Sequence, residues 1–104
     1  MATYVSLISF TDQGIRNVKQ SPERAKAATA AAGKLGIKIR DIFWTLGQYD
    51  LVVIADAPND EAVTAWALGT GSLGNVRTQT MRAFTAEETN KILAKLPQEP
   101  EKPG

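Results

Sequence analysis

Apolar residues gather along the chain in four segments whose pattern predicts β-strands. The segments are rich in β-branched and aromatic residues and are bounded by turn or helix-start signals: 3–10, 37–46, 51–55 and 75–84. The run 51–55 is continuously apolar, which predicts an interior strand with both faces covered. The segment 75–84 alternates only in part and is more polar, so we expect it to form an edge strand or a strand that carries a site.

Three helix-start signals separate or follow these segments. Ser21-Pro22-Glu23 combines a capping residue, a proline and an acid, and Gly36 is placed to end that helix with a left-handed residue. Residues 57–61 give a second start with proline and acids, and Thr85 with Glu88 three residues later gives a third.

Apolar stripes predict which face of each helix points inward. In the first helix the stripe consists of Ala25, Ala28, Ala32 and Leu35. The second carries Val63, Trp66 and Leu68, and we expect the glycines Gly69, Gly71 and Gly74 to stop it. The last carries Ile92, Leu93 and Leu96. Thr11 and Asp12 predict one further short helical turn.

The resulting order of elements predicts an α+β, ferredoxin-like βαββαβ fold with a four-stranded antiparallel sheet and an extra C-terminal helix. Residues 1–96 form one domain in this prediction, and 97–104 are too rich in proline and charge to pack, so we expect a disordered tail. Helices on one face leave the other face of the sheet without cover. Because 3–10 and 51–55 are apolar on both sides, we expect self-association through the sheet into a dimer or higher homo-oligomer.

The segment Trp44-Thr45-Leu46-Gly47-Gln48-Tyr49-Asp50 predicts a hairpin in the middle of the chain. Gly47 provides its turn geometry, and Gly36 and Gly74 are expected to have similar structural roles after the two longer helices.

With this turn and its flanks, the chain resembles the GYD domain family, which is grouped with the dimeric α/β-barrel superfamily. The residues that carry the resemblance are Tyr4-Val5-Ser6-Leu7, Thr11-Asp12-Gln13-Gly14-Ile15, Ser21-Pro22, the segment 44–50, 71–78 and Arg82-Ala83-Phe84-Thr85. The resemblance implies the ferredoxin-like fold and an oligomer built on face-to-face sheets, and it carries no catalytic residue to this chain. Alanine-rich 21–36 and Trp66 depart from the family pattern, which suggests an engineered interface in a designed variant.

The composition excludes several classes of partner and of catalytic chemistry. Twelve basic and eleven acidic residues leave a formal charge of +1, which argues against nucleic acid and anionic membranes as partners. Cysteine and histidine are absent, so thiolate chemistry, disulfides and the commonest metal ligands are excluded, and the carboxylates form no spaced set. We therefore expect no metal and no cofactor. The N-terminus lacks a signal-type leader and no apolar run is long enough for a membrane helix, which predicts a cytoplasmic protein.

Five residues are candidates for ligand binding. Trp44, Tyr49 and Asp50 would meet Arg77 and Arg82 of the last strand segment, so that an aromatic wall, a carboxylate and guanidinium groups could hold a small polar or aromatic molecule. In the structural alternative Asp50 bonds nearby backbone N–H groups, and the arginines pair with Asp41, Asp50 or Asp56. The glycines in 69–74 match a dinucleotide motif only formally, because a helix precedes them and a strand follows, so nucleotide binding is not expected.

Three functions follow from these observations. The first is a self-assembling homo-oligomer with a small-molecule pocket between sheet and helices. The second is a cofactor-independent oxygenase or isomerase that uses Tyr4, Tyr49, Asp50 and Arg77. The third is an engineered building block of a symmetric assembly, which long charged residues at Ala27 and Ala30 would disrupt.

Overall fold

A computed structural model describes residues 1–97. Its elements are β1 (Ala2–Phe10), α1 (Asp12–Arg16), the 3₁₀ turn η1 (Val18–Gln20), α2 (Ser21–Lys34), β2 (Lys38–Trp44), β3 (Leu51–Ala57), α3 (Asp60–Ser72), β4 (Val76–Ala83) and α4 (Ala86–Leu93). The tail predicted at 97–104 lies, apart from Pro97, outside the described residues.

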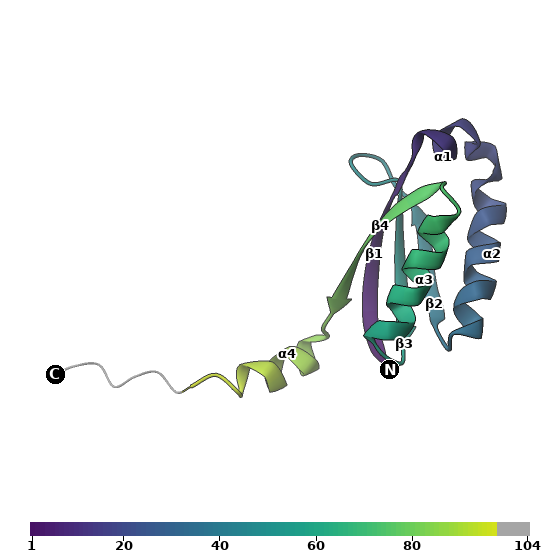
Figure 1. The fold of residues 1–104 in the computed structure, drawn as a ribbon. Helices are drawn as coiled ribbons and strands as arrows, with labels where there is room; N and C mark the ends of the chain where they lie inside the picture. The colour runs from purple at the N-terminus through teal and green to yellow at the C-terminus, as the bar shows by residue number, and fades with distance from the viewer. Residues whose placement is uncertain (98–104) are drawn as a thin grey trace.

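The four strands form one antiparallel sheet in the order β2-β3-β1-β4. Helices α2 and α3 lie side by side against one face of this sheet, and α4 follows β4 at the C-terminal end (Figure 1). This arrangement confirms the predicted ferredoxin-like architecture with an extra C-terminal helix. Within residues 1–97 no helix combines the length and hydropathy needed to cross a lipid bilayer.

Burial alternates along the two central strands. In β3, Leu51, Val53, Ala55 and Ala57 are buried, whereas the residues between them are only partly buried. The expectation that both faces of this strand are covered was therefore wrong for the single chain. The physical reason is the layer arrangement: side chains of a strand point alternately to two faces, and the helices cover only one of them.

The helix-facing side chains form the core. Tyr4 and Ile8 of β1 and Ile37 before β2 pack with the buried residues of β3, with Ala32 of α2 and with Val63 of α3. Trp66 completes this core at 4% exposure, and its indole Nε1 donates to the carbonyl oxygen of Ala28 at 2.9 Å. Trp66 thus joins α3 to the backbone of α2.

Helix α3 is longer than the glycines suggested. It begins at a cap in which the Asn59 side chain accepts from the N–H of Ala62, and it continues through Gly69 and Gly71 to Ser72. A glycine inside a helix costs only about 1 kcal/mol, which packing of the helix can offset. The chain turns only at Gly74, whose φ of 88° lies in the left-handed region. The prediction that Gly69 stops the helix was therefore wrong.

Helix α2 covers the sheet mainly with alanines. Ala32 is fully buried, and Ala25 and Ala28 are half-buried, in agreement with the predicted stripe. Leu35 departs from it, because the helix ends at Lys34 and Leu35 is 39% exposed at the cap. Gly36 then follows with a φ of 76°.

The short helix α1 is tied to the residue that precedes β4. The Thr11 side chain accepts from the N–H of Gly14 at 3.1 Å, and the Thr11 N–H donates to the carbonyl oxygen of Asn75 at 3.1 Å. Gly14 is buried because the Asn75 backbone lies directly against it.

Helix α4 begins with the predicted capping box between Thr85 and Glu88. It leads away from the sheet on the side opposite α2 and α3 (Figure 1). Its apolar side chains Ile92 and Leu93 are open to solvent in the single chain at 42% and 54% exposure, and Leu96, which was predicted in the same helix, lies after the helix end at 62% exposure.

Candidate binding surface

The face of the sheet away from α2 and α3, called here the open face, has an apolar centre. Val5 and Leu7 of β1 lie opposite Ile54 and Val52 of β3 in the antiparallel register. All four are half-buried by their strand neighbours, and within residues 1–97 no helix lies above them. Directly paired β-branched and aliphatic residues of this kind form one continuous apolar surface.

Two larger side chains extend this surface across the sheet. Phe43 of β2 pairs with Val52, and Met81 of β4 pairs with Val5. Phe43 is 53% exposed and Met81 is 41% exposed. We define the open-face patch as Val5, Leu7, Phe43, Val52, Ile54 and Met81.

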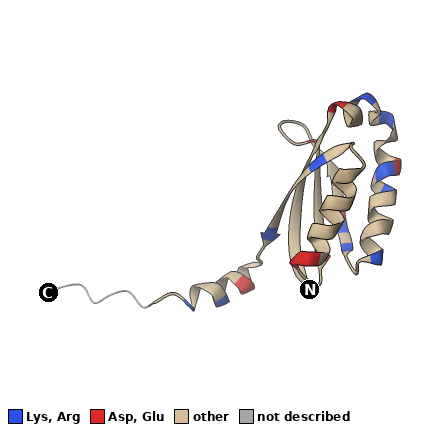
Figure 2. Ribbon diagram, viewed as in Figure 1, with Lys and Arg blue, Asp and Glu red and all other residues tan. Residues whose placement is uncertain are grey.

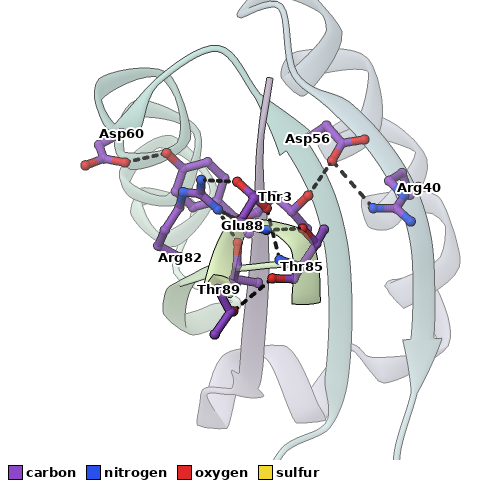
Figure 3. A network of polar contacts seen from close by, with 10 residues as sticks. Thr3, Arg40, Asp56, Asp60, Arg82, Thr85, Glu88 and Thr89 are labelled. Carbon is purple, nitrogen blue, oxygen red and sulfur yellow. Dashed lines mark hydrogen bonds and ion pairs between the residues drawn. The ribbon is translucent and has the colours of Figure 1, made fainter. Parts of the chain in front are cut away.

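Charge near the patch is balanced within the chain. Asp56, at one end of β3, accepts from the Thr3 hydroxyl at 3.0 Å and lies 3.6 Å from Arg40 (Figure 3). The carboxylate is therefore compensated before any partner arrives, which lowers the electrostatic cost of covering this face.

The loop between β2 and β3 borders the other end of the patch. The Asp50 carboxylate accepts from the N–H of Phe10 at 2.8 Å, and the N–H of Asp50 donates to the carbonyl oxygen of Ile8 at 2.8 Å. Asp50 thus bonds the backbone of β1, as the structural alternative described. The Tyr49 hydroxyl reaches Gln79 of β4 at 2.7 Å, so Tyr49 lies near the strand that carries Arg77.

The five predicted ligand residues do not meet at one point. Trp44 pairs with Leu51, faces the helices, and donates its indole N–H to the Ser21 hydroxyl at 3.0 Å. Arg77 pairs with Ser9 on the open face, whereas Arg82 pairs with Tyr4 on the helix-facing side. The geometry therefore divides the five residues between two faces of the sheet.

Arg82 belongs to a separate polar cluster, formed by Tyr4, Asp60, Arg82, Phe84 and Glu88 (Figure 3 labels the charged members). Its guanidinium lies 3.0 Å from Glu88, and its Cζ is 5.8 Å from the Tyr4 ring centroid and 4.4 Å from that of Phe84. Such cation–π contacts orient a guanidinium over aromatic faces.

Hydrogen bonds shift two pKa values in this cluster. The buried Tyr4 hydroxyl donates to the Asp60 carboxylate, and this bond, followed by burial, raises the pKa of Tyr4 above its usual 10.0. The Thr85 backbone N–H, followed by the Arg82 side chain, lowers the pKa of Glu88 below its usual 4.5. Tyr4 therefore keeps its proton at neutral pH, which makes it a hydrogen-bond donor and a poor base.

The four residues of the enzyme hypothesis are also spread apart. Tyr4 faces the helices, Asp50 binds the β1 backbone, and Tyr49 and Arg77 border the open face. Among residues 1–97 no three acidic side chains gather closely enough to hold a metal ion. These four residues therefore do not meet in one site, and Tyr4 instead lines a separate pocket together with Asp60 and Arg82.

The sequence did not identify Asp60 as the hydrogen-bond partner of Tyr4. Asp60 was interpreted only as an acid at the start of α3, because its partner Tyr4 is 56 positions away. Glu88 was expected from the capping box, but its pairing with Arg82 was not. The sequence signal for this cluster is weak: an acid at the helix start that follows a strand.

The chain is similar to known proteins in both sequence and structure. A family model described as GYD domain matches residues 4–93. A protein of Thermus thermophilus, named glutamine synthetase and cystathionine beta-lyase binding protein, is 30% identical over 85 residues, which cover 81% of this chain and 90% of the relative. The crystal structure of TTHA0845 from Thermus thermophilus is similar with a TM-score of 0.54 and 27% identity, over 83% of this chain and 96% of that chain.

Proposed function

From the premise that this chain belongs to the GYD domain family, we propose that it is a binding protein that works as a homo-oligomer held together by its open-face patch. The observation that carries the proposal is the apolar, in-register centre of the open face, formed by Val5, Leu7, Val52 and Ile54. Burying this surface against a second copy removes apolar area from water, which is the main driving force of association.

A second copy fits this surface for reasons of symmetry and charge. A two-fold axis places the same patch on both sides of a contact, so a flat apolar sheet face is complementary to itself. Asp56 pairs with Arg40. Asp41 and Arg77, which the register places on the same face, have opposite charges, so the open face has little net charge to repel the second copy.

Helix α4 supports the same proposal. It leaves the body on the side of the open face, and its apolar side chains are open to solvent in the single chain (Figure 1). We expect Ile92, Leu93 and Leu96 to pack against the second copy beside the sheet contact.

Other proteins are the second class of partner. The name of the Thermus thermophilus relative supports binding to enzymes of the kinds it specifies. If the open face is used for self-association, α2, which carries Arg24, Lys26 and Lys34 beside the acidic Glu23, stays available to such partners (Figure 2). Charged surfaces of this type give specificity and faster association.

The test compares two leucine-to-arginine variants by native mass spectrometry and size-exclusion chromatography with light scattering. Leu7→Arg introduces a charge at the centre of the open-face patch, and we expect a monomer. Leu68→Arg introduces the same charge on α3, where Leu68 is 70% exposed, and we expect the wild-type oligomer. A monomeric wild-type protein, or an oligomer that Leu7→Arg leaves intact, contradicts the proposal.

A second candidate function is a building block of a larger symmetric assembly, in which α2 makes an additional contact. The observation in its favour is that Ala27, Ala30 and Ala31 of α2 are exposed, and their small size permits close approach. A variant with Ala27→Glu and Ala30→Lys should then reduce the assembly to the sheet-held dimer. An unchanged subunit count would eliminate this second contact.

A further inference from the structure

A partly open cavity of about 190 Å³ lies between α2, α3 and the helix-facing side of the sheet. Figure 1 shows the two helices that flank it. Its walls include Ile8, Ala25, Ala28, Leu51, Val53 and Trp66. The lining is almost wholly apolar, and it is separate from the open-face patch on the other side of the sheet.

The cavity exists because α2 presents small side chains to the sheet. Ala25 and Ala28 are too short to fill the space above Leu51 and Val53. The bond from Trp66 to the carbonyl oxygen of Ala28 joins the two helices at a fixed separation. This hydrogen bond therefore opposes a movement of α2 and α3 that would close the cavity.

Four of the five polar side chains in the lining, those of Ser21, Arg24, Thr29 and Asn75, already have partners within the protein. Thr29 donates to the carbonyl oxygen of Ala25 at 2.8 Å, and the Asn75 side-chain oxygen accepts from Gln13 at 3.0 Å. Arg24 donates to the main-chain oxygens of Asn17 at 2.8 Å and Gly14 at 3.3 Å. A cavity whose polar groups are mostly satisfied offers water few hydrogen bonds, so an apolar occupant is favoured over water.

The rim gives a route for entry. Gly69 and Leu73, at the C-terminal end of α3, line the cavity and are exposed, and Gly69 has no side chain to close the gap. A small molecule can reach the interior there without separating the strands.

We propose that this cavity is a binding site for a neutral, mainly apolar molecule with one or two rings. The size argument is direct, because an engineered apolar cavity of about 150 Å³ in another protein holds benzene. No acidic side chain lines the cavity, so a cation would lack a partner there, and Arg24, the one charged lining residue, already donates to the main-chain oxygens of Asn17 and Gly14. This binding site does not depend on the proposed oligomer, because all of its lining residues belong to one chain.

The test measures binding of indole by two-dimensional NMR of the full chain. We expect saturable shifts of the Trp66 indole N–H and of the amide signals of Ala28 and Val53. In Ala28→Leu the added side chain occupies the cavity, and we expect at least about tenfold weaker binding of indole. Ala30→Leu is the matched control, because Ala30 is exposed on the same helix and does not line the cavity.

Further variants keep the result interpretable. Ala25→Leu fills the cavity from another position and should weaken indole binding as Ala28→Leu does. If one of these two variants does not fold, the other still tests the proposal. Leu7→Arg should bind indole as the wild type does, which separates this site from the oligomer contact. Shifts centred on the open-face patch, wild-type binding by both cavity variants, or no saturable binding by the wild type would overturn the proposal.

Discussion

Tyr4 connects the central strand to the start of α3 through its bond to Asp60. Because this bond raises the pKa of Tyr4, the folded chain holds the phenol proton more tightly than the unfolded chain. The bond contributes fully below the unfolded pKa of about 10, and its contribution is lost as the pH rises through the higher folded pKa.

We predict that Tyr4→Phe lowers the free energy of unfolding by about 1–3 kcal/mol at neutral pH and removes the Tyr4 contribution to alkaline destabilisation. Urea unfolding followed by circular dichroism, at neutral pH and above about pH 10, measures both effects. Tyr49→Phe is the control, since it removes the hydroxyl bonded to exposed Gln79 and should keep the alkaline loss. An identical alkaline loss in Tyr4→Phe would contradict the assignment.

Gly14 and Gly33 are glycines for different reasons: Gly14 lies in close contact with another segment, whereas Gly33 is exposed within α2. A Cβ atom at Gly14 would overlap the carbonyl oxygen of Asn75, whereas one at Gly33 would meet nothing within 4 Å. We predict that Gly14→Ala destabilises the protein by about 2 kcal/mol or more, through displacement of the backbone before β4. Gly33→Ala should instead stabilise α2 by about 0.5–1 kcal/mol. Chemical denaturation of both variants tests the pair, and equal effects would refute this explanation.

Among the elements, α4 depends most on its own cap, because its apolar residues are uncovered in the single chain. Thr85→Ala removes the side-chain acceptor for the Glu88 N–H. We predict faster hydrogen exchange at the first turn of α4 and little change in the sheet.

The same cap makes the stability of α4 depend on pH in the acidic range. The folded pKa of Glu88 is lowered, so its stabilising contribution is present above the ordinary value of 4.5 and is lost as the pH falls through the folded pKa. Exchange of the α4 amides, corrected for the intrinsic pH effect, should therefore increase on acidification more than exchange of the β1 amides. Equal changes would argue against the cap as the cause.

Element starts could be predicted because their signals are local. Helices begin at Ser21-Pro22 and directly after the caps Asn59 and Thr85, and each signal depends on residues within one turn. The capping role expected of Ser21 was wrong, because Ser21 is the first residue of α2 and its hydroxyl accepts from the Trp44 indole. The end of α3 was mispredicted, since the packing of Val63 and Trp66 against the core outweighs the propensity of Gly69.

The candidate site was harder to predict, because its contacts join distant positions. The bond between Tyr4 and Asp60 depends on how α3 lies across β1, which no local pattern specifies. Strand register likewise decides on which face of the sheet Trp44 and Arg77 lie. A shift of the register by one residue would move each side chain to the opposite face.

For the whole molecule, association through the open-face patch predicts that thermal stability depends on concentration. Dilution favours the monomer, so the melting temperature of the wild type should fall as protein concentration falls. Leu7→Arg should melt at one temperature over the same range. Calorimetry at several concentrations measures this difference, and a wild-type melting temperature independent of concentration would contradict the oligomer.

Strand β1 precedes the other strands along the chain, yet it lies between β3 and β4 and pairs with both. During translation the hairpin of β2 and β3 can form early, but the apolar side chains of β1 obtain their last neighbour only when β4 has left the ribosome. Contacts between distant segments are slow to form because a long loop must close first. The sheet is therefore completed only after α3 and β4 have been synthesised, and any factor that shields the nascent β1 segment acts before that point.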